Sequence, residues 1–74
     1  MNFDFSKLLG RIKEFGFTQK SLAKVIGISS STLSAKLNNK NAFTVTEIAC
    51  ICRVLDVSKL EVGKYFFTEK VQEN

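Results

Sequence analysis

The sequence predicts an all-α protein, a compact bundle of about five short helices, and three observations carry this prediction. Apolar residues recur at helical spacing, hydroxyl residues suited to helix N-caps stand before them, and no proline interrupts the chain. The 74 residues have the length of one domain with a thin core. We therefore expect a single domain over residues 1–74, with its helical core in residues 5–62 and a separate C-terminal segment at 63–74.

Asp4 or Ser6 is expected to cap the first helix, since either side chain can accept a hydrogen bond from a free amide of the first turn. We predict that this helix ends at Gly16, because glycine suits the turn that follows a helix. Gly10 lies inside it and favours a close contact with a neighbouring helix. The apolar face of this helix consists of Leu8, Leu9, Ile12 and Phe15.

The next two helices are predicted over residues 19–26 and 30–38, with Thr18 and Ser29 as their N-caps. Gly27 stands directly after the first of them, where the left-handed backbone conformation suits glycine. The inward-facing residues of the pair are Leu22, Ala23, Ile26, Leu33 and Leu37. The chain is therefore expected to turn sharply between two short helices.

The last two helices are predicted from capping boxes, in which a hydroxyl residue stands three positions before a glutamate. The first box, residues 44–47, precedes an apolar series formed by Ile48, Ile51 and Leu55. The second box, residues 58–61, opens a short fifth helix that Gly63 is expected to close. Within residues 64–74, the stretch 67–71 alternates loosely between apolar and polar, which predicts an extended segment or a short strand.

The segment over residues 19–38 carries the strongest functional signal. Two helices joined by a tight turn at Gly27 must pack at a steep angle, and the small Ala23 lets their backbones approach. The wedge between them is filled by Leu22, Ile26, Ile28 and Leu33. This pattern is typical of a helix-turn-helix, whose second helix enters the major groove of DNA.

The charge of the chain is concentrated in the same half as this motif. Residues 1–40 contain seven basic and two acidic side chains, a balance of +5. Residues 41–74 contain four basic and five acidic side chains, a balance of −1, so the total is +4. An excess of positive charge around the motif is expected if that half faces a polyanion such as DNA.

The sequence resembles the lambda-repressor-like family of phage and bacterial regulators (Cro and repressor proteins, XRE-type) over about residues 5–62. The matching residues of the motif are Gln19, Leu22, Ala23, Gly27, Ile28, Ser29, Thr32 and Leu33. Residues 33–40 and 65–72 are similar to a narrower group, the small Cro-like prophage regulators of Gram-positive bacteria. The resemblance implies a cytoplasmic repressor in a bacterial host. It would be a homodimer, at least on DNA, reading a near-palindromic operator in double-stranded DNA.

The resemblance also assigns residues to DNA contacts. The positions that the family uses to face base edges are occupied here by Ser30, Ser31, Ser34, Ala35 and Asn38. Contacts to phosphates are expected from Gln19, Lys20, Lys36, Asn39 and Lys40. Lys36 departs from the family pattern, which commonly has an apolar residue at this position. Either its stem lines the core while its ammonium reaches the surface, or Leu37 takes the core role and the helix is rotated slightly.

Three consecutive aromatic residues near the C-terminus, Tyr65, Phe66 and Phe67, are too many for a short solvated tail. They are candidates for a dimer contact. The alternative is that they complete the thin core of a single chain.

A second functional hypothesis is a protein-interaction module on the same fold, such as an antirepressor or an antitoxin. An enzyme is the least favoured class, because the chain has no histidine, no glycine-rich phosphate loop and little room for a deep pocket. We therefore expect no small-molecule substrate and no cofactor. Cys50 and Cys52, separated by one residue, predict neither a zinc site nor a disulfide framework. The longest apolar run, residues 48–52, is too short to cross a membrane, so we expect no membrane association.

Overall fold

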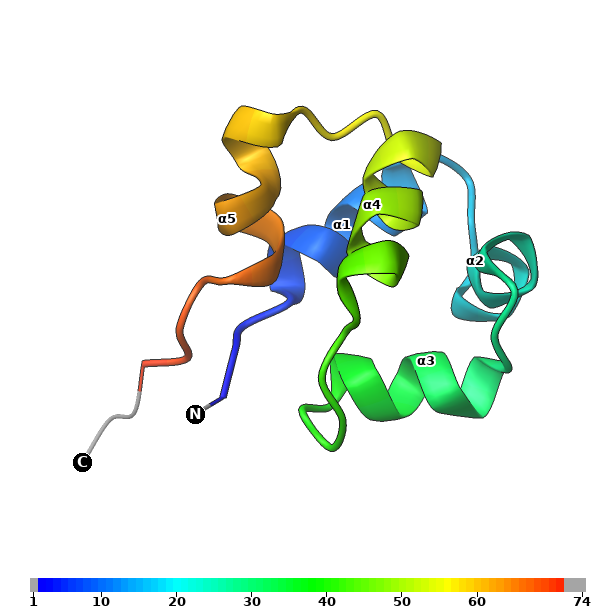
Figure 1. Ribbon diagram of the computed structural model, residues 1–74, viewed down its shortest axis with the longest axis horizontal. Helices are drawn as coiled ribbons and strands as arrows, with labels where there is room; N and C mark the ends of the chain where they lie inside the picture. The colour runs from blue at the N-terminus through cyan, green and yellow to red at the C-terminus, as the bar shows by residue number, and fades with distance from the viewer. Residues whose placement is uncertain (1, 72–74) are drawn as a thin grey trace.

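The computed structural model describes residues 2–71, and within them it confirms an all-α bundle of five α-helices (Figure 1). The helices and one 3-10 turn are α1 (Ser6–Glu14), α2 (Gln19–Ile26), α3 (Ser30–Leu37), α4 (Val45–Val54), η1 (Lys59–Glu61) and α5 (Val62–Phe66). The end of the predicted C-terminal segment, residues 72–74, lies outside the described residues.

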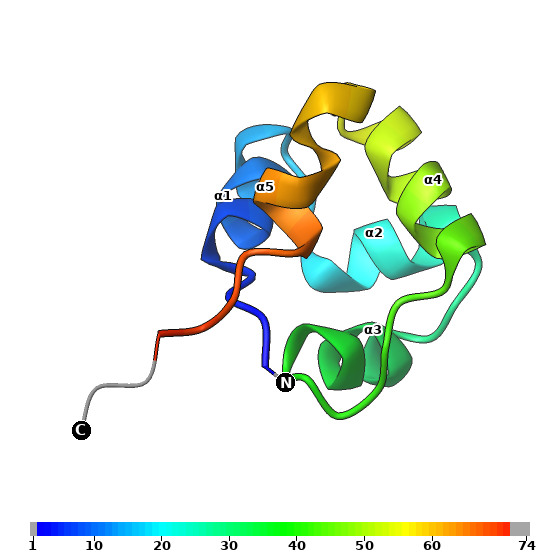
Figure 2. The same ribbon diagram turned by 60° about the vertical axis from the view of Figure 1, so that its left-hand side comes forward.

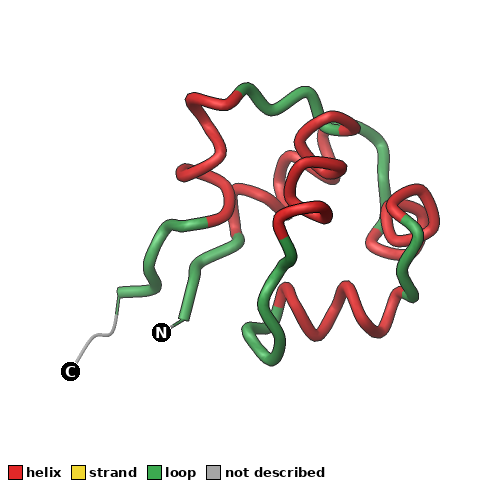
Figure 3. The backbone as a smooth tube through the Cα atoms, viewed as in Figure 1, coloured by secondary structure: helices red, strands yellow, loops and turns green. Residues whose placement is uncertain are grey.

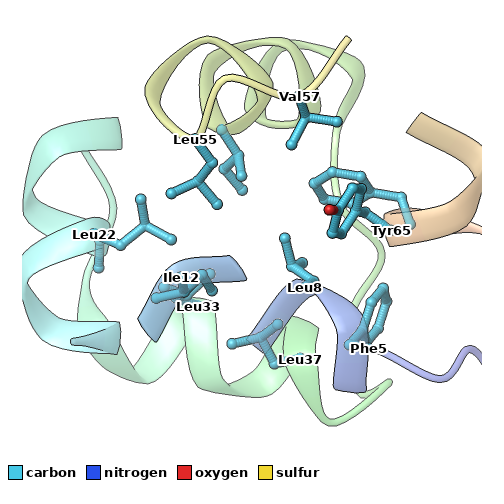
Figure 4. Packing of buried hydrophobic residues seen from close by; sticks show 12 residues of the cluster. Phe5, Leu8, Ile12, Leu22, Leu33, Leu37, Leu55, Val57 and Tyr65 are labelled. Carbon is cyan, nitrogen blue, oxygen red and sulfur yellow. The ribbon is translucent and has the colours of Figure 1, made fainter. Parts of the chain in front are cut away.

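All five helices contribute to one apolar core (Figure 4). Leu8 of α1, Leu22 of α2 and Leu33 of α3 are fully buried, as is Leu55 directly after α4. Phe66 of α5 is 2% exposed and completes the cluster on the side of α1. The helices are short, so this shared burial, rather than their intrinsic propensity, supplies most of their stability.

The predicted caps at the starts of α2 and α4 are confirmed. The Thr44 hydroxyl accepts a hydrogen bond from the Glu47 N–H at 3.1 Å, and the Glu47 carboxylate accepts one from the Thr44 N–H at 2.8 Å. At α2 the reciprocal pair is Thr18 with Ser21. The Ser29 hydroxyl accepts from the Thr32 N–H at the start of α3. These bonds satisfy amides that a helix start otherwise leaves without a partner.

The prediction for the fifth helix is wrong in two respects. Ser58 does not cap it through its side chain. Its hydroxyl donates to the Glu61 carboxylate at 3.3 Å, and residues 59–61 form the 3-10 turn η1. Gly63 does not end the helix, which continues to Phe66. The continuation is favoured because it turns Tyr65 and Phe66 into the core. The extended segment therefore begins only after Phe66.

The first helix also differs from its prediction. Its N-cap residue is Phe5, and Asp4 instead accepts the Ser6 N–H at 2.9 Å in a turn before the helix. The close helix contact expected at Gly10 is wrong, because no heavy atom other than those of its chain neighbours and the backbone of α1 lies within 4 Å of the position that a Cβ would take there. Gly16 has a φ of +79° and makes the predicted turn after α1.

The two ends of the described chain run side by side (Figures 1 and 2). Phe3 and Glu69 form an isolated antiparallel β-bridge, with the Asp4 N–H donating to the Thr68 carbonyl at 2.7 Å. On its other edge, the Phe3 N–H donates to Asn39 Oδ1 at 2.8 Å, and Asn39 Nδ2 donates to the Phe3 carbonyl at 3.0 Å. The Asn39 side-chain amide thus pairs with both backbone groups of Phe3, as a neighbouring β-strand would.

This double hydrogen bond predicts a measurable role for Asn39. Its backbone is left-handed, with a φ of 63°, which asparagine tolerates better than most residues. Asn39→Gly keeps that backbone accessible and removes the side chain with both of its hydrogen bonds, so we expect it to lower the free energy of unfolding by about 1–2 kcal/mol. Asn39→Ala adds the left-handed strain and should lower it further. Urea denaturation measures both, and faster hydrogen exchange at the Phe3 amide in the two variants identifies the bond as the cause.

Candidate interaction surface

The predicted tight turn joins α2 and α3. Gly27 has a φ of 82°, and the Ile28 N–H donates to the Ala23 carbonyl at 3.0 Å, which closes the end of α2. Ala23 is 1% exposed and belongs to the apolar core. Helix α3 lies along one edge of the molecule with one long side free of other helices (Figures 1 and 3).

The free side of α3 bears short polar side chains. Of the predicted base-facing residues, Ser30, Ser31 and Asn38 are exposed, and Ser34 and Ala35 are half-buried. Asn38 Nδ2 donates to the Ser34 carbonyl at 2.8 Å, so part of its amide is already used within the helix. The face therefore offers hydroxyl groups and one amide, and it carries no charge of its own.

Lys36 is turned away from this face. Its residue is 8% exposed, and its ammonium lies 2.5 Å from the Glu47 carboxylate at the start of α4. The stem packs at the core, as in the first of the two alternatives, but the ammonium pairs with α4 and Leu37 is buried as well. The positive charge of Lys36 is thus balanced inside the molecule.

The same pair sets the protonation of the carboxylate. Burial by itself raises the pKa of Glu47. Hydrogen bonds from the Lys36 ammonium and the Thr44 backbone N–H outweigh the burial and hold that pKa below its ordinary value. Glu47 is consequently charged at neutral pH and bonds both α3 and its own helix.

The other predicted phosphate-contacting residues are distributed around the two helices. Gln19 and Lys20 are exposed at the start of α2, and Lys40 is exposed just after α3. The side-chain amide of Asn39 is occupied by the Phe3 backbone. Lys20 also lines a shallow hollow of about 460 Å³ between α2 and the start of α3, together with Lys24.

The segment around α3 has a positive net charge, which is shared by several lysines. Residues 15–46 contain four lysines and no acidic residue. Lys36 is paired internally, so Lys20, Lys24 and Lys40 supply the exposed charge. Arg11 is also used internally, donating to the Leu55 and Asp56 carbonyls at the end of α4 at 2.9 and 3.0 Å.

The C-terminal aromatic residues are divided between core and surface. Tyr65 and Phe66 are 8% and 2% exposed and belong to the chain's own core, which is the second of the two alternatives. Phe67 is 53% exposed and remains available for a partner. The inward turn of Tyr65 was not evident from sequence, since it depends on α5 continuing past Gly63.

Other kinds of site are not apparent in the part of the chain that the structure describes. Residues 2–71 contain no cluster of three or more histidine, cysteine or acidic residues able to hold a metal. None of the described helices has the length and apolar character needed to cross a membrane. Cys50 and Cys52 are free thiols, and burial raises the pKa of Cys52.

Comparison with known proteins finds a similar phage protein among solved structures. A solved structure, the modulator of repression of the temperate bacteriophage TP901-1 from Lactococcus lactis, is 40% identical to the chain. It superposes with a TM-score of 0.78 and covers 97% of both chains. Among curated proteins, none matches.

The relative supports the expectation of a phage regulator, while the family differs from the one that the sequence resembles. The matching family is not the lambda-repressor-like family. It is described only as a protein of unknown function, DUF739, and its model matches residues 1–69. This match spans all five helices, and the chain therefore belongs to the DUF739 family.

Proposed function

We propose that this protein modulates repression in a temperate phage by binding the phage's repressor protein in the cytoplasm of the bacterial host. The observation that carries the proposal is its 40% identity, over 97% of both chains, to a protein named for modulating repression. A match of this extent makes it reasonable to assign the same kind of activity to the whole chain rather than to one motif.

The chemistry of α3 supports a protein partner over DNA. Base readout in the major groove relies mainly on long or bidentate side chains such as arginine, lysine, asparagine and glutamine. The free side of α3 has serines and an alanine, together with Asn38, whose amide already bonds Ser34. Lys36, the one cation within α3, is paired with Glu47. Short side chains allow another protein surface to approach the helix closely, with serine hydroxyls as adaptable hydrogen-bonding groups.

A second candidate function is operator binding, and the charge distribution favours it. Residues 15–46 lack acidic side chains, and Gln19, Lys20 and Lys40 are exposed around a free helix joined to α2 by a tight turn. In this alternative a homodimer formed on DNA reads a near-palindromic operator. Its predicted base-facing residues are Ser30, Ser31, Ser34, Ala35 and Asn38.

The test measures binding of the purified protein to the repressor of the phage that encodes it, by calorimetry. We expect the wild-type chain to bind the repressor. For Ser31→Trp we expect the affinity to fall about tenfold or more, since a bulky ring on the free side of α3 blocks the close approach of the partner. Thr46→Trp is the matched control, because Thr46 is exposed on α4 and should tolerate the same ring.

Titration with operator DNA and a scrambled duplex, at two salt concentrations, separates the two functions. The proposal expects weak binding without preference for the operator, falling with salt. Tight and selective binding to the operator, with no binding to the repressor, contradicts the proposal and establishes the second candidate.

A further inference from the structure

A hollow lined by aromatic rings opens beside the end of α3. It encloses about 190 Å³ between the N-terminal segment, the α3–α4 loop and the end of α5. For comparison, an engineered cavity of roughly 150 Å³ lined by apolar side chains binds benzene. The apolar part of the lining is Phe3, Phe5, Ala42, Phe43, Ile48, Phe66 and Phe67. The hollow is therefore large enough for one aromatic side chain.

Edge-to-face contacts hold the walls of this hollow in place. The ring centroid of Phe43 lies 5.4 Å from that of Phe5 and 5.3 Å from that of Phe66, at interplanar angles of 80° and 88°. Phe3 packs edge-on against Phe67 at 5.9 Å, and its backbone is held by the amide of Asn39. The site is thus formed before any partner arrives, and aromatic edges and faces suit a further ring.

The rim of the hollow offers main-chain hydrogen bonds. Within residues 2–71, the backbone N–H and carbonyl groups of residues 41–43 make no hydrogen bond with the rest of the chain. Asn41 and Ala42 are exposed residues, and Phe43 is half-buried. A loop stretch with free donors and acceptors can hydrogen-bond an extended peptide, one of whose side chains can then enter the hollow.

The charge of the rim selects for an acidic partner. The lining includes Lys36 and Lys40 and no acidic residue. Lys36 is paired with Glu47, whereas Lys40 is exposed at the edge of the hollow. A carboxylate flanking the inserted side chain therefore meets a cation and no opposing acidic side chain among the lining residues.

We propose that this hollow receives an aromatic side chain from an extended, acidic segment of the phage repressor. The inference rests on the proposed function and adds a docking site to it. Lys36 of α3, and Asn39 and Lys40 directly after it, line the hollow, so the hollow adjoins the C-terminal end of α3.

Ala42→Trp tests the site, because the new ring fills the hollow. We expect the affinity for the repressor to fall at least about tenfold, as for the loss of a central interface contact. Ala49→Trp is the matched control, since Ala49 is exposed on α4 and lies outside the lining. A second pair, Lys40→Glu with Lys59→Glu as control, reverses one exposed lysine at the rim and one on η1. Only the first member of each pair should weaken binding.

Each outcome decides between the site and the function. Wild-type binding that is unchanged in Ala42→Trp and Lys40→Glu overturns the docking site and leaves the proposed function intact. Absence of wild-type binding overturns both. A wild-type dimer in sedimentation that Ala42→Trp dissociates shows that a second copy occupies the hollow, which also overturns the proposal. Thermal melting checks folding, and if Ala42→Trp is unfolded the lysine pair decides.

Discussion

Replacing Phe66 by alanine is expected to lower the free energy of unfolding by about 3–5 kcal/mol, the largest effect among the changes considered. The ring is 2% exposed and packs edge-on against Phe43, and its removal leaves a cavity among α1, α5 and the α3–α4 loop. Small domains have total stabilities near the lower end of about 5–15 kcal/mol, so much of the variant should be unfolded at 37 °C. Urea denaturation followed by circular dichroism measures the loss.

Phe67→Ala provides the matched control for this prediction. Phe67 is the same residue type one position later, but it is 53% exposed, and we expect its loss to remain below about 1 kcal/mol. Equal effects of the two substitutions would contradict the assignment of Phe66 to the core. Stability of Phe66→Ala that depends on protein concentration would instead identify the end of α5 as a contact between two chains.

Lys36→Ala is expected to have the second-largest effect, a loss of about 2–3 kcal/mol at pH 7. Its stem packs at the core and its ammonium pairs with Glu47, so alanine leaves both a gap and a largely buried carboxylate without its cation. The Thr44 N–H still donates to that carboxylate, so the loss of stability is smaller than for a buried charge with no hydrogen-bond partner. Lys36→Met is the control, because it keeps the apolar stem volume and removes only the charge.

The effect of Lys36→Ala should depend on pH. The pKa of Glu47 in the folded chain is below the ordinary value, which is about 4.3. The ion pair therefore stabilises the fold above that ordinary pKa, and its contribution is lost as the pH falls through the lowered, folded pKa. Unfolding measured from pH 7 to pH 3 should show the wild-type advantage shrinking in the acid range. A difference that stays constant would assign the whole effect to packing.

The starts of α2, α3 and α4 were predictable from sequence because a capping interaction spans only three residues. Thr18, Ser29 and Thr44 bond amides at the third position after them, and no distant contact is needed to place those bonds. The turn at Gly27 is equally local, since its left-handed conformation depends on the residue itself. The exposure of Ser31 and Asn38 follows from the burial of Leu33 and Leu37 on the opposite side of α3.

The sequence by itself therefore determined the helical class, the tight turn and the free side of α3. Only the tertiary structure decided where Lys36 and Asn39 point, because their partners are eleven and thirty-six residues away. It also carried α5 past Gly63, since burying Tyr65 and Phe66 outweighs a local stop signal. Long-range pairing of this kind depends on the packed arrangement of all five helices, and the spacing of residues along the chain does not encode it in a readable pattern.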